Sequence, residues 1–208
     1  MRIALQPTAW KDALEHQEET IGVLKRLDKL PTNYTGLMVE HRFAYGYIGE
    51  LAVRTALRIR GRKFEHRFDS SGSAGPPDFS VWDKEGFWKG AEVKCAAKPF
   101  HNNLAFPAKQ KRHILKSHYL IATRCMTDTP ADGREIPMSI EGWCTKKTWK
   151  NRIPQGPDNR WSIPTYVIPF ISLEPIEQLF ENLLAAGDDP FEVRQEAAYQ
   201  QQRKEMSR

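Results

Sequence analysis

The sequence predicts an α/β fold, with a mixed central sheet flanked by helices and extra helices at both ends. Apolar residues recur at helical spacing in some segments, while in others they alternate or run together as in strands. Clusters of glycine, proline and small polar residues separate these segments. The resulting order is helix, three strands, helix, strand, which is typical of a sheet covered by helices. At 208 residues, one domain around one core is expected.

Two helices are expected before the first strand. Residues 8–30 carry apolar positions at loose helical spacing up to Pro31, which predicts an N-terminal helical cap over residues 1–31. A second helix is expected over 37–60, because Gly61 can take the left-handed conformation past a helix end. The apolar residues of this helix cover more than one side, which is typical of a buried helix.

Three strands and a further helix–strand pair complete the expected core of residues 37–124. The strands are predicted at 63–68, 78–82 and 87–95, with a loop at 69–77 and a tight turn at 83–86. The last two strands are close enough in sequence to form an antiparallel hairpin. After a loop at 98–106, Pro107 is suited to open a helix through Ser117, and 119–123 reads as a buried strand.

The rest of the chain is predicted to decorate this core. Residues 125–173 are expected to add strands at 138–144 and 166–168, with a short helix capped by Thr145 between them. Residues 174–208 are expected to form C-terminal helices at 176–186 and 190–208. No repeat and no second domain is evident, so residues 1–208 are treated as one domain.

Composition argues for a protein outside the membrane. No apolar run approaches the ~20 residues that a bilayer span needs. The segment 1–7 lacks the apolar stretch of a signal peptide, so a cytoplasmic location is expected, or the host cytoplasm for a phage protein. The three cysteines are widely spaced, which favours buried thiols over a disulfide framework. A mixed zinc site with His101, His113 or His118 stays open as a minor alternative.

Positive charge is concentrated in the middle of the chain. The net charge is +5, which is modest evidence for a polyanionic partner. The distribution is more informative, because the segment 93–124 has seven Lys or Arg residues and no Asp or Glu. The cations Lys109, Arg112 and Lys116 share one face of the expected helix, where they are candidates for phosphate contacts or a solvated surface.

Asp78, Glu92 and Lys94 are the candidate catalytic residues. Thirteen residues separate Asp78 from Glu92, and Val93 stands between Glu92 and Lys94. Side chains alternate along a strand, so Glu92 and Lys94 project from one face while Val93 points into the core. A suitable hairpin register brings Asp78 beside Glu92. Without further context, Glu92 and Lys94 could equally be charged residues of an exposed strand that make a cross-strand salt bridge.

This arrangement suits metal-assisted hydrolysis of phosphodiesters. Mg²⁺ takes hard oxygen ligands, keeps several waters and needs only one or two carboxylates, so Asp78 and Glu92 are expected to bind it with the carbonyl of Val93. Mn²⁺ is an expected substitute. Lys94 can orient or deprotonate the attacking water, or stabilise the transition state. Glu50 shares a helical stripe with Val53 and Leu57 and is a candidate for a further metal contact, although Arg54 at i+4 could pair with it.

The segments Pro77-Asp78 and Glu92-Val93-Lys94 resemble the signature of the PD-(D/E)XK nuclease superfamily, also called restriction-endonuclease-like. Upstream, the stretch 46–52, which contains Gly49-Glu50, resembles its helical glycine-and-glutamate motif. The resemblance covers about residues 37–123 and implies a helix–three-strands–helix–strand nuclease core. It also implies that the helix after the lysine, with Lys109, Gln110 and Arg112, approaches substrate phosphates, and Lys116 on the same helix is a further candidate for contact with DNA. The stretches 140–143 and 166–169 resemble segments of phage- and restriction-associated members.

Two functions therefore follow as hypotheses. The first is a Mg²⁺-dependent DNA nuclease, with an endonuclease acting on double-stranded DNA as first choice and a homodimer left open. The second is a catalytically silent DNA-binding module of a larger replication, transposition or defence complex. Two carboxylates beside a phosphate site repel DNA unless a metal neutralises them, which favours the nuclease. Trp149, among basic residues, is the aromatic side chain that could stack on a base.

Overall fold

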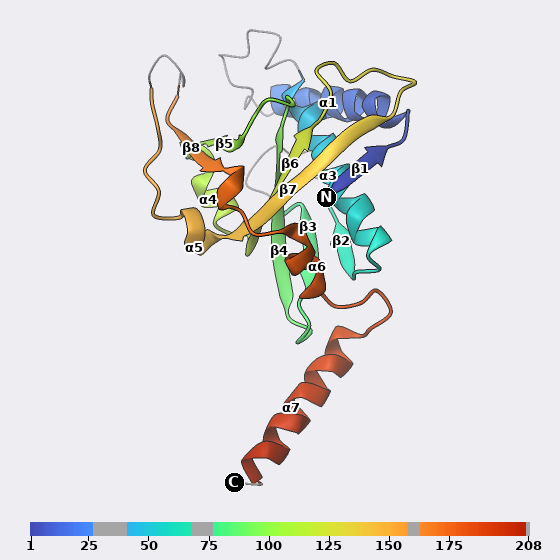
Figure 1. Ribbon diagram of the computed structural model, residues 1–208, viewed down its shortest axis with the longest axis vertical. Coiled ribbons are helices and arrows are strands. Elements are labelled where there is room, and N and C mark those ends of the chain that lie inside the picture. Colours follow the sequence, from blue (N-terminus) through green and yellow to red (C-terminus); the bar gives the residue numbers. More distant parts are fainter. Residues whose placement is uncertain (27–40, 68–76, 158–162, 207–208) are drawn as a thin grey trace.

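A mixed six-stranded sheet forms the centre of the protein, which is seen in a computed structural model that describes residues 1–26, 41–67, 77–157 and 163–206 (Figure 1). The strands of this sheet, in chain order, are β1 (Arg2–Leu5), β2 (Phe64–His66), β3 (Phe79–Trp82), β4 (Trp88–Ala96), β6 (Tyr119–Cys125) and β7 (Ile136–Thr145). Their spatial order is β1-β7-β6-β4-β3-β2. Only β4 and β6 pair in parallel, and the other neighbours are antiparallel. The predicted α/β class with a mixed sheet is confirmed.

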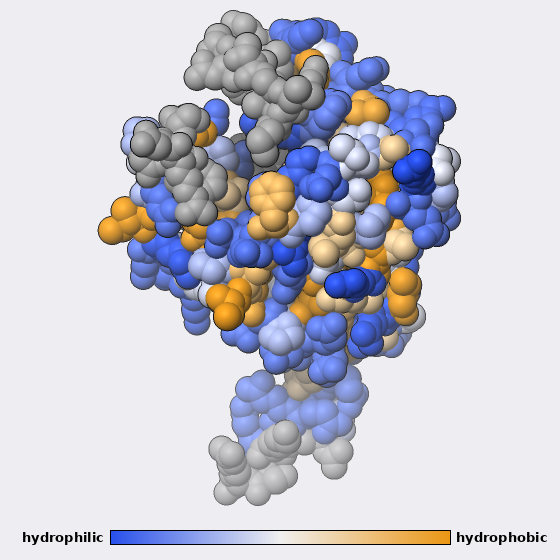
Figure 2. Space-filling view, turned by 45° about the horizontal axis from the view of Figure 1, so that its top comes forward, coloured by the Kyte–Doolittle hydropathy of each residue, from blue (hydrophilic) through white to orange (hydrophobic). Residues whose placement is uncertain are grey.

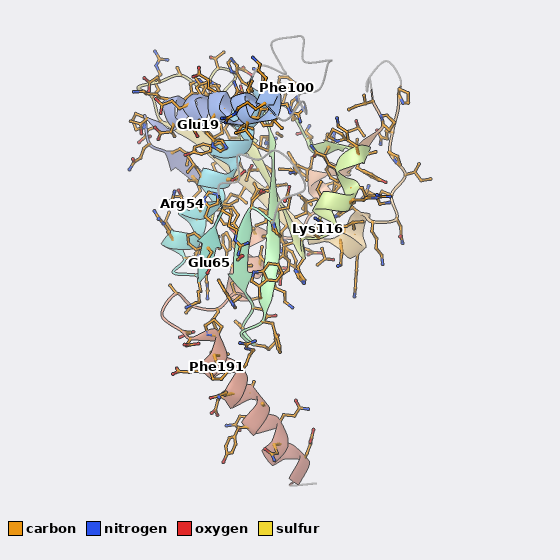
Figure 3. The ribbon with its side chains drawn as sticks, turned by 180° about the vertical axis from the view of Figure 1, so that it is seen from behind. Glu19, Arg54, Glu65, Phe100, Lys116 and Phe191 are labelled. Atoms are coloured by element: carbon orange, nitrogen blue, oxygen red, sulfur yellow. The ribbon has the colours of Figure 1, made fainter. Side chains whose placement is uncertain are left out.

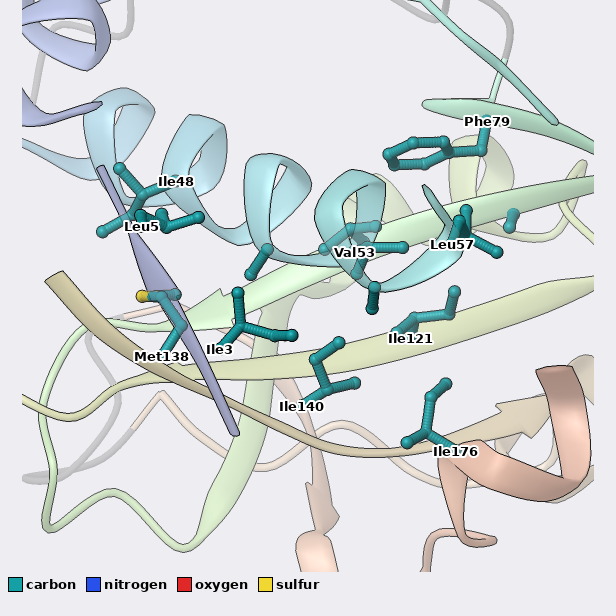
Figure 4. Packing of buried hydrophobic residues seen from close by; sticks show 14 of the residues in the cluster. Ile3, Leu5, Ile48, Val53, Leu57, Phe79, Ile121, Met138, Ile140 and Ile176 are labelled. Atoms are coloured by element: carbon teal, nitrogen blue, oxygen red, sulfur yellow. The ribbon is translucent and has the colours of Figure 1, made fainter. Parts of the chain in front are cut away.

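One face of the sheet is covered by α1 (Ala9–Arg26), α3 (Arg42–Ile59) and α6 (Ile176–Glu181). The α3 helix lies across the strands, and Ile48, Val53 and Leu57 point into the packed cluster (Figure 4). Gln17 of α1 accepts a hydrogen bond from the backbone N–H of Ala44 at 3.4 Å, which satisfies one of the N–H groups that a helix leaves open in its first turn. This face forms the larger hydrophobic core.

The opposite face carries a smaller unit that we call the side lobe. It consists of β5 (Asn103–Pro107), the 3₁₀ turn η1 (Ala108–Gln110), α4 (Lys111–Ile114), α5 (Lys146–Trp149) and β8 (Thr165–Pro169). Strands β5 and β8 pair as a separate two-stranded sheet. The lobe packs a second buried cluster, which includes Ile114 and Trp149, against Leu120 and Ala122 of β6. Because side chains alternate along a strand, every second side chain of the central strands therefore points toward the side lobe.

Two strands were missed or misread in the sequence. Residues 1–31 were predicted as a helical cap, but β1 precedes α1 and pairs with β7 at the edge of the sheet. Residues 98–106 were predicted as a loop, but β5 occupies 103–107. Leu104 and Phe106 are buried there while Ala105 is exposed, an alternation too short to distinguish from a loop without its partner β8.

Two predicted helices are shorter than expected. The helix predicted over 107–117 is reduced to η1 and the single turn of α4, because the preceding residues belong to β5. The helix predicted over 176–186 ends at Glu181. After it, Leu184 donates its backbone N–H to the carbonyl of Trp82 at 2.8 Å. Leu183 also forms an isolated antiparallel bridge with Asp83, directly after β3.

The chain ends in α7 (Pro190–Met206), which extends away from the rest of the molecule (Figure 1). The short 3₁₀ turn η2 (Phe170–Ser172) lies directly after β8 and before α6. Hydrophilic residues dominate the face in Figure 2, where apolar residues form small groups. Over the described part of the chain, no helix combines the length and apolar character needed to cross a membrane.

Candidate active site

Glu92 and Lys94 project from the same face of β4, as predicted. In the parallel pairing with β6, Glu92 lies opposite Leu120 and Lys94 opposite Ala122, and both partners belong to the cluster beneath the side lobe. Val93 points the other way into the core beneath α3. Glu92 is 1% exposed, and its carboxylate accepts a hydrogen bond from the Lys94 ammonium. Glu92 and Lys94 therefore form a buried ion pair and are not charged residues of an exposed strand.

Asp78 reaches this pair from the neighbouring strand. The last pair of the β3–β4 ladder is Phe79 opposite Ala91, so one further step in the same register sets Asp78 opposite Glu92. The Asp78 carboxylate accepts the backbone N–H of Val93 at 2.7 Å. Its backbone carbonyl accepts the N–H of Arg67 at 2.9 Å. Asp78 is thus held by β4 on one side and by the residue after β2 on the other.

The carbonyl of Val93 faces the same edge as its N–H. In an antiparallel ladder, both backbone groups of a residue point toward the same neighbouring strand. Because the Val93 N–H reaches Asp78, the Val93 carbonyl also lies toward the Asp78 side. This placement is compatible with the predicted role of that carbonyl beside the two carboxylates.

Gly90 makes room for the residue before Asp78. A Cβ atom added at Gly90 would lie 2.5 Å from Cγ of Pro77, far inside van der Waals contact. Pro77 is buried, so its ring packs over the bare backbone of β4. The glycine therefore helps to fix the entry of the chain into β3 and with it the position of Asp78.

Glu50 approaches the site from α3 on the other face of the sheet. The preceding residue, Gly49, allows this approach, because a Cβ there would lie 2.6 Å from Oγ1 of Thr123 and 2.9 Å from Cβ of Cys95. By contrast, an added Cβ at Gly46 meets nothing within 4 Å. Of the two glycines in the predicted helical motif, Gly49 is therefore the one that brings α3 onto β4 and β6.

His66 is a site residue that sequence reasoning missed. Its Nε2 lies 3.0 Å from Oε2 of Glu50, and its ring stacks on Phe79, the residue after Asp78, with centroids 4.3 Å apart. His66 thereby links the α3 carboxylate to the strand that carries Asp78. The available signal was a histidine in the strand predicted just before the loop to Asp78, but the pairing of β2 with β3 was needed to interpret it.

Three carboxylates close together perturb one another. Burial raises the pKa of Asp78 well above its ordinary value, and the charges of Glu50 and Glu92 raise it further, against Lys94 and the Val93 N–H. Burial also raises the pKa of Glu50 to about 8, while Lys94 lowers it and Glu92 raises it. The site therefore has more carboxyl groups than the single ammonium of Lys94 can neutralise. At neutral pH, bound protons remove the excess negative charge.

Lys94 and His66 carry opposite protonation states at neutral pH. Burial lowers the pKa of Lys94, but Glu92 and Asp78 raise it more in sum, so it stays above its ordinary value and the side chain is an ammonium. Burial, followed by the charges of Arg54 and Arg58, lowers the pKa of His66 to about 4. A neutral His66 shares one hydrogen with Glu50 rather than forming an ion pair with it.

The donors in this site fit Mg²⁺ in kind. Two carboxylates, a carbonyl and waters are hard oxygen ligands and are sufficient for that ion, and a cation bound beside the raised-pKa carboxyl groups would favour their ionised form. Within the described ranges, no group of three or more His, Cys, Asp or Glu side chains is arranged to hold a metal. Glu50 is paired with His66, so Asp78, Glu92 and the Val93 carbonyl are the direct candidates.

The predicted phosphate-contact residues lie on the face that carries Glu92 and Lys94. Lys109, Arg112 and Lys116 are exposed and Gln110 is half-buried, and the α4 turn is anchored by Ile114 in the cluster of the side lobe. Figure 3 shows Lys116 on one side of the sheet and Arg54 of α3 on the other. These four residues remain candidates for contact with the substrate.

Trp149 does not have the exposure that base stacking requires. It is 1% exposed and packs edge-on against Phe106 and Tyr166, so it is a core residue of the side lobe. All three cysteines are free; Cys125 and Cys144 are buried as predicted, whereas Cys95 is half-buried.

Comparison with known proteins does not identify a relative of this chain. No protein-family model, no curated protein and no solved structure matches it.

Proposed function

We propose that this protein is a Mg²⁺-dependent nuclease of the PD-(D/E)XK type that cleaves DNA as an endonuclease. The observation that carries the proposal is the convergence of Asp78, Glu92 and Lys94 in one partly buried site, with Glu50 beside them. A bare sequence match would not require these groups to meet. Their electrostatic coupling is typical of functional sites rather than of solvated surface charges.

The chain's own residues divide the work of phosphodiester hydrolysis. When bound, Mg²⁺ supplies Lewis acidity and lowers the pKa of a water ligand. Asp78 and Glu92 would hold the ion with the Val93 carbonyl, and the Val93 N–H donates a hydrogen bond that orients the Asp78 carboxylate. Lys94 is an ammonium in this geometry, which favours orientation of the water and stabilisation of charge on the phosphate oxygens over a role as proton acceptor.

The surroundings support a nucleic-acid substrate. The order α3, β2, β3, β4, α4, β6 agrees with the helix–three-strands–helix–strand order that the resemblance implies, with β5 inserted before α4. Exposed cations of η1 and α4 lie on the face of the site. Phosphate contacts from such residues position a nucleic acid without reading its sequence.

The test is cleavage of plasmid, linear duplex and single-stranded DNA by the purified protein with Mg²⁺, Mn²⁺ or EDTA. We expect nicking or linearisation of the plasmid with either metal and none with EDTA. Asp78→Ala and Lys94→Ala should each lower the rate at least 100-fold, since each removes a group that acts directly in the transition state.

Lys89→Ala is a matched control for Lys94→Ala. Lys89 lies on the same strand and also pairs with a carboxylate, with its Nζ 3.1 Å from Oδ2 of Asp83, but it belongs to the hairpin end of β4. Its replacement should leave cleavage within about threefold of wild type. Absence of cleavage by wild type, or equal rates for the Lys94 and Lys89 variants, refutes the assignment. DNA binding without any cleavage would favour the silent module instead.

A further inference from the structure

The side lobe carries exposed cations on two separate segments. Three of them, Lys109, Arg112 and Lys116, lie in η1, in α4 and in the turn after α4, and the other three lie in α5 and directly after it. Lys146 and Lys147 of α5 and Lys150, the residue after it, are all exposed and are called the α5 lysines. The sequence between residues 97 and 118 and between 142 and 173 contains a single acid, Asp158, which lies outside the described residues. The positive charge of this lobe is therefore hardly compensated from within.

The packing of Trp149 sets the direction of the α5 lysines. Its indole is buried against Phe106 of β5 at 5.2 Å and Tyr166 of β8 at 5.8 Å between ring centroids. One side of this single helical turn is therefore anchored in the lobe. Lys146, Lys147 and Lys150 remain on the outside, and their charges are presented from a rigid support.

The position of α5 relative to the candidate site follows from the strand registers. Glu92 of β4 lies opposite Leu120 of β6, and Leu120 lies opposite Cys144 of β7. Two strand spacings amount to roughly 10 Å, and α5 begins two residues after Cys144. The α5 lysines thus lie about 10–15 Å from Glu92 by this spacing, a span of only a few nucleotides along one DNA strand.

The aromatic residues of the lobe favour contact with the DNA backbone over contact with the bases. The Phe, Trp and Tyr residues of its helices and strands are Phe106, Trp149 and Tyr166, and all three are buried. Proteins that hold single strands usually offer exposed rings on which bases stack. Within the described helices and strands of the lobe, no exposed ring accompanies the cations, an arrangement suited to a duplex, which displays its phosphates and keeps its bases inside.

We propose that Lys146, Lys147 and Lys150 hold the phosphate backbone of double-stranded DNA beside the scissile bond, as a second basic segment next to Lys109, Arg112 and Lys116. This inference rests on the proposed function, because it assumes that DNA enters the site. It extends that function by placing a specific part of the substrate, the duplex flanking the cut, over β7 and the side lobe.

The test compares wild type with the triple variant Lys146→Gln, Lys147→Gln and Lys150→Gln. Binding to a labelled 20-base-pair duplex is measured by fluorescence anisotropy in EDTA between 50 and 300 mM NaCl. We expect at least 10-fold weaker binding at about 100 mM salt, and a slope of log K against log salt that is shallower by about 2–3, since each lost phosphate contact removes about 0.9. In Mg²⁺, KM should rise while kcat stays within about threefold.

The matched control removes the same charge from the opposite face. Lys11→Gln, Lys25→Gln and Arg26→Gln replace exposed cations of α1, which packs on α3 away from the lobe. This variant should bind the duplex within about threefold of wild type. Circular dichroism and thermal unfolding of both variants show whether the fold is kept, as expected for exposed positions.

Three results would overturn the inference. They are an unchanged salt slope in the α5 variant, an equal loss of binding in the α1 variant, and an equal loss for a single strand of the same length. The proposed catalysis has a separate readout, because binding is measured without metal. If wild type never cuts but the α5 variant loses duplex binding as expected, the surface stands and the nuclease assignment fails.

Discussion

Replacing Glu50 by Gln should stabilise the metal-free protein at neutral and alkaline pH. The buried carboxyl of Glu50 has a pKa of about 8 in the folded protein against an ordinary value of 4.5. Between these values, the folded state keeps a proton that the unfolded state releases. Stability in wild type is therefore lost as the pH rises from 4.5 toward 8. Glutamine keeps the shape and can donate its amide N–H to His66, but it has no charge to bury.

The size of the effect follows from the shift. The full difference between the folded and ordinary pKa values of Glu50 corresponds to a loss of roughly 5 kcal/mol of unfolding free energy above pH 8, at about 1.4 kcal/mol for each pKa unit. The Glu50 side chain keeps 21% of its surface exposed, and solvent screening reduces the figure. We expect a gain of about 2 kcal/mol for Glu50→Gln at pH 8 and less than about 1 kcal/mol at pH 5.

Urea unfolding in EDTA at half-unit steps from pH 5 to 9 measures this difference. The wild-type and variant curves should converge at the acid end and separate as the pH rises. Glu65→Gln is the control, because Glu65 is exposed on β2 and its removal should shift stability by less than about 0.5 kcal/mol at any pH. Parallel curves for wild type and Glu50→Gln over the whole range would refute the burial argument.

Three further predictions concern the framework of the site. Gly49→Ala should cost about 1–3 kcal/mol of unfolding free energy, because its Cβ would overlap Thr123, whereas Gly46→Ala, with open space around it, should be neutral or stabilising by up to about 1 kcal/mol in urea unfolding. Arg124→Met should lower the thermal midpoint by several degrees, since this side chain pairs with a carboxylate of β7 and donates to two backbone carbonyls before β5. Trp149→Ala should cost about 3–5 kcal/mol, and a loss of only DNA affinity with unchanged unfolding would show that its burial is wrong.

The local parts of the candidate site were the predictable ones. Alternation alone places Glu92 and Lys94 on one face of a strand and Val93 on the other, and the short turn between β3 and β4 requires their pairing. The position of Asp78 needed one more quantity, the register, which depends on the turn and on the packing of Pro77 over Gly90. Sequence patterns do not predict that packing. The sequence therefore predicts that Asp78 lies beside Glu92 only if the hairpin has a suitable register.

Long-range pairings account for what the sequence did not predict. The partner of β1 is β7 and the partner of β5 is β8, each far away in the chain, and short strands are stable only with such partners. The contact between Glu50 and His66 depends in the same way on α3 packing beside β2. His66 carries no motif of its own, and Trp149 looked accessible because the β5–β8 sheet that buries it was not foreseen.

The two faces of the sheet make different contributions to the candidate site. On one face, Gly49 brings α3 close to β4 and β6, so Glu50 is supplied by the main core and held by His66. On the other face, Glu92 and Lys94 lie toward the side lobe with its exposed cations. Asp78 joins them at the point where β3 begins, held by the N–H of Val93. In the proposed nuclease, Asp78 and Glu92 would bind the metal at the central sheet, and the lobe would hold the DNA. Substitutions in α4 and α5 should change substrate affinity, and those around Glu50 should change metal affinity and stability.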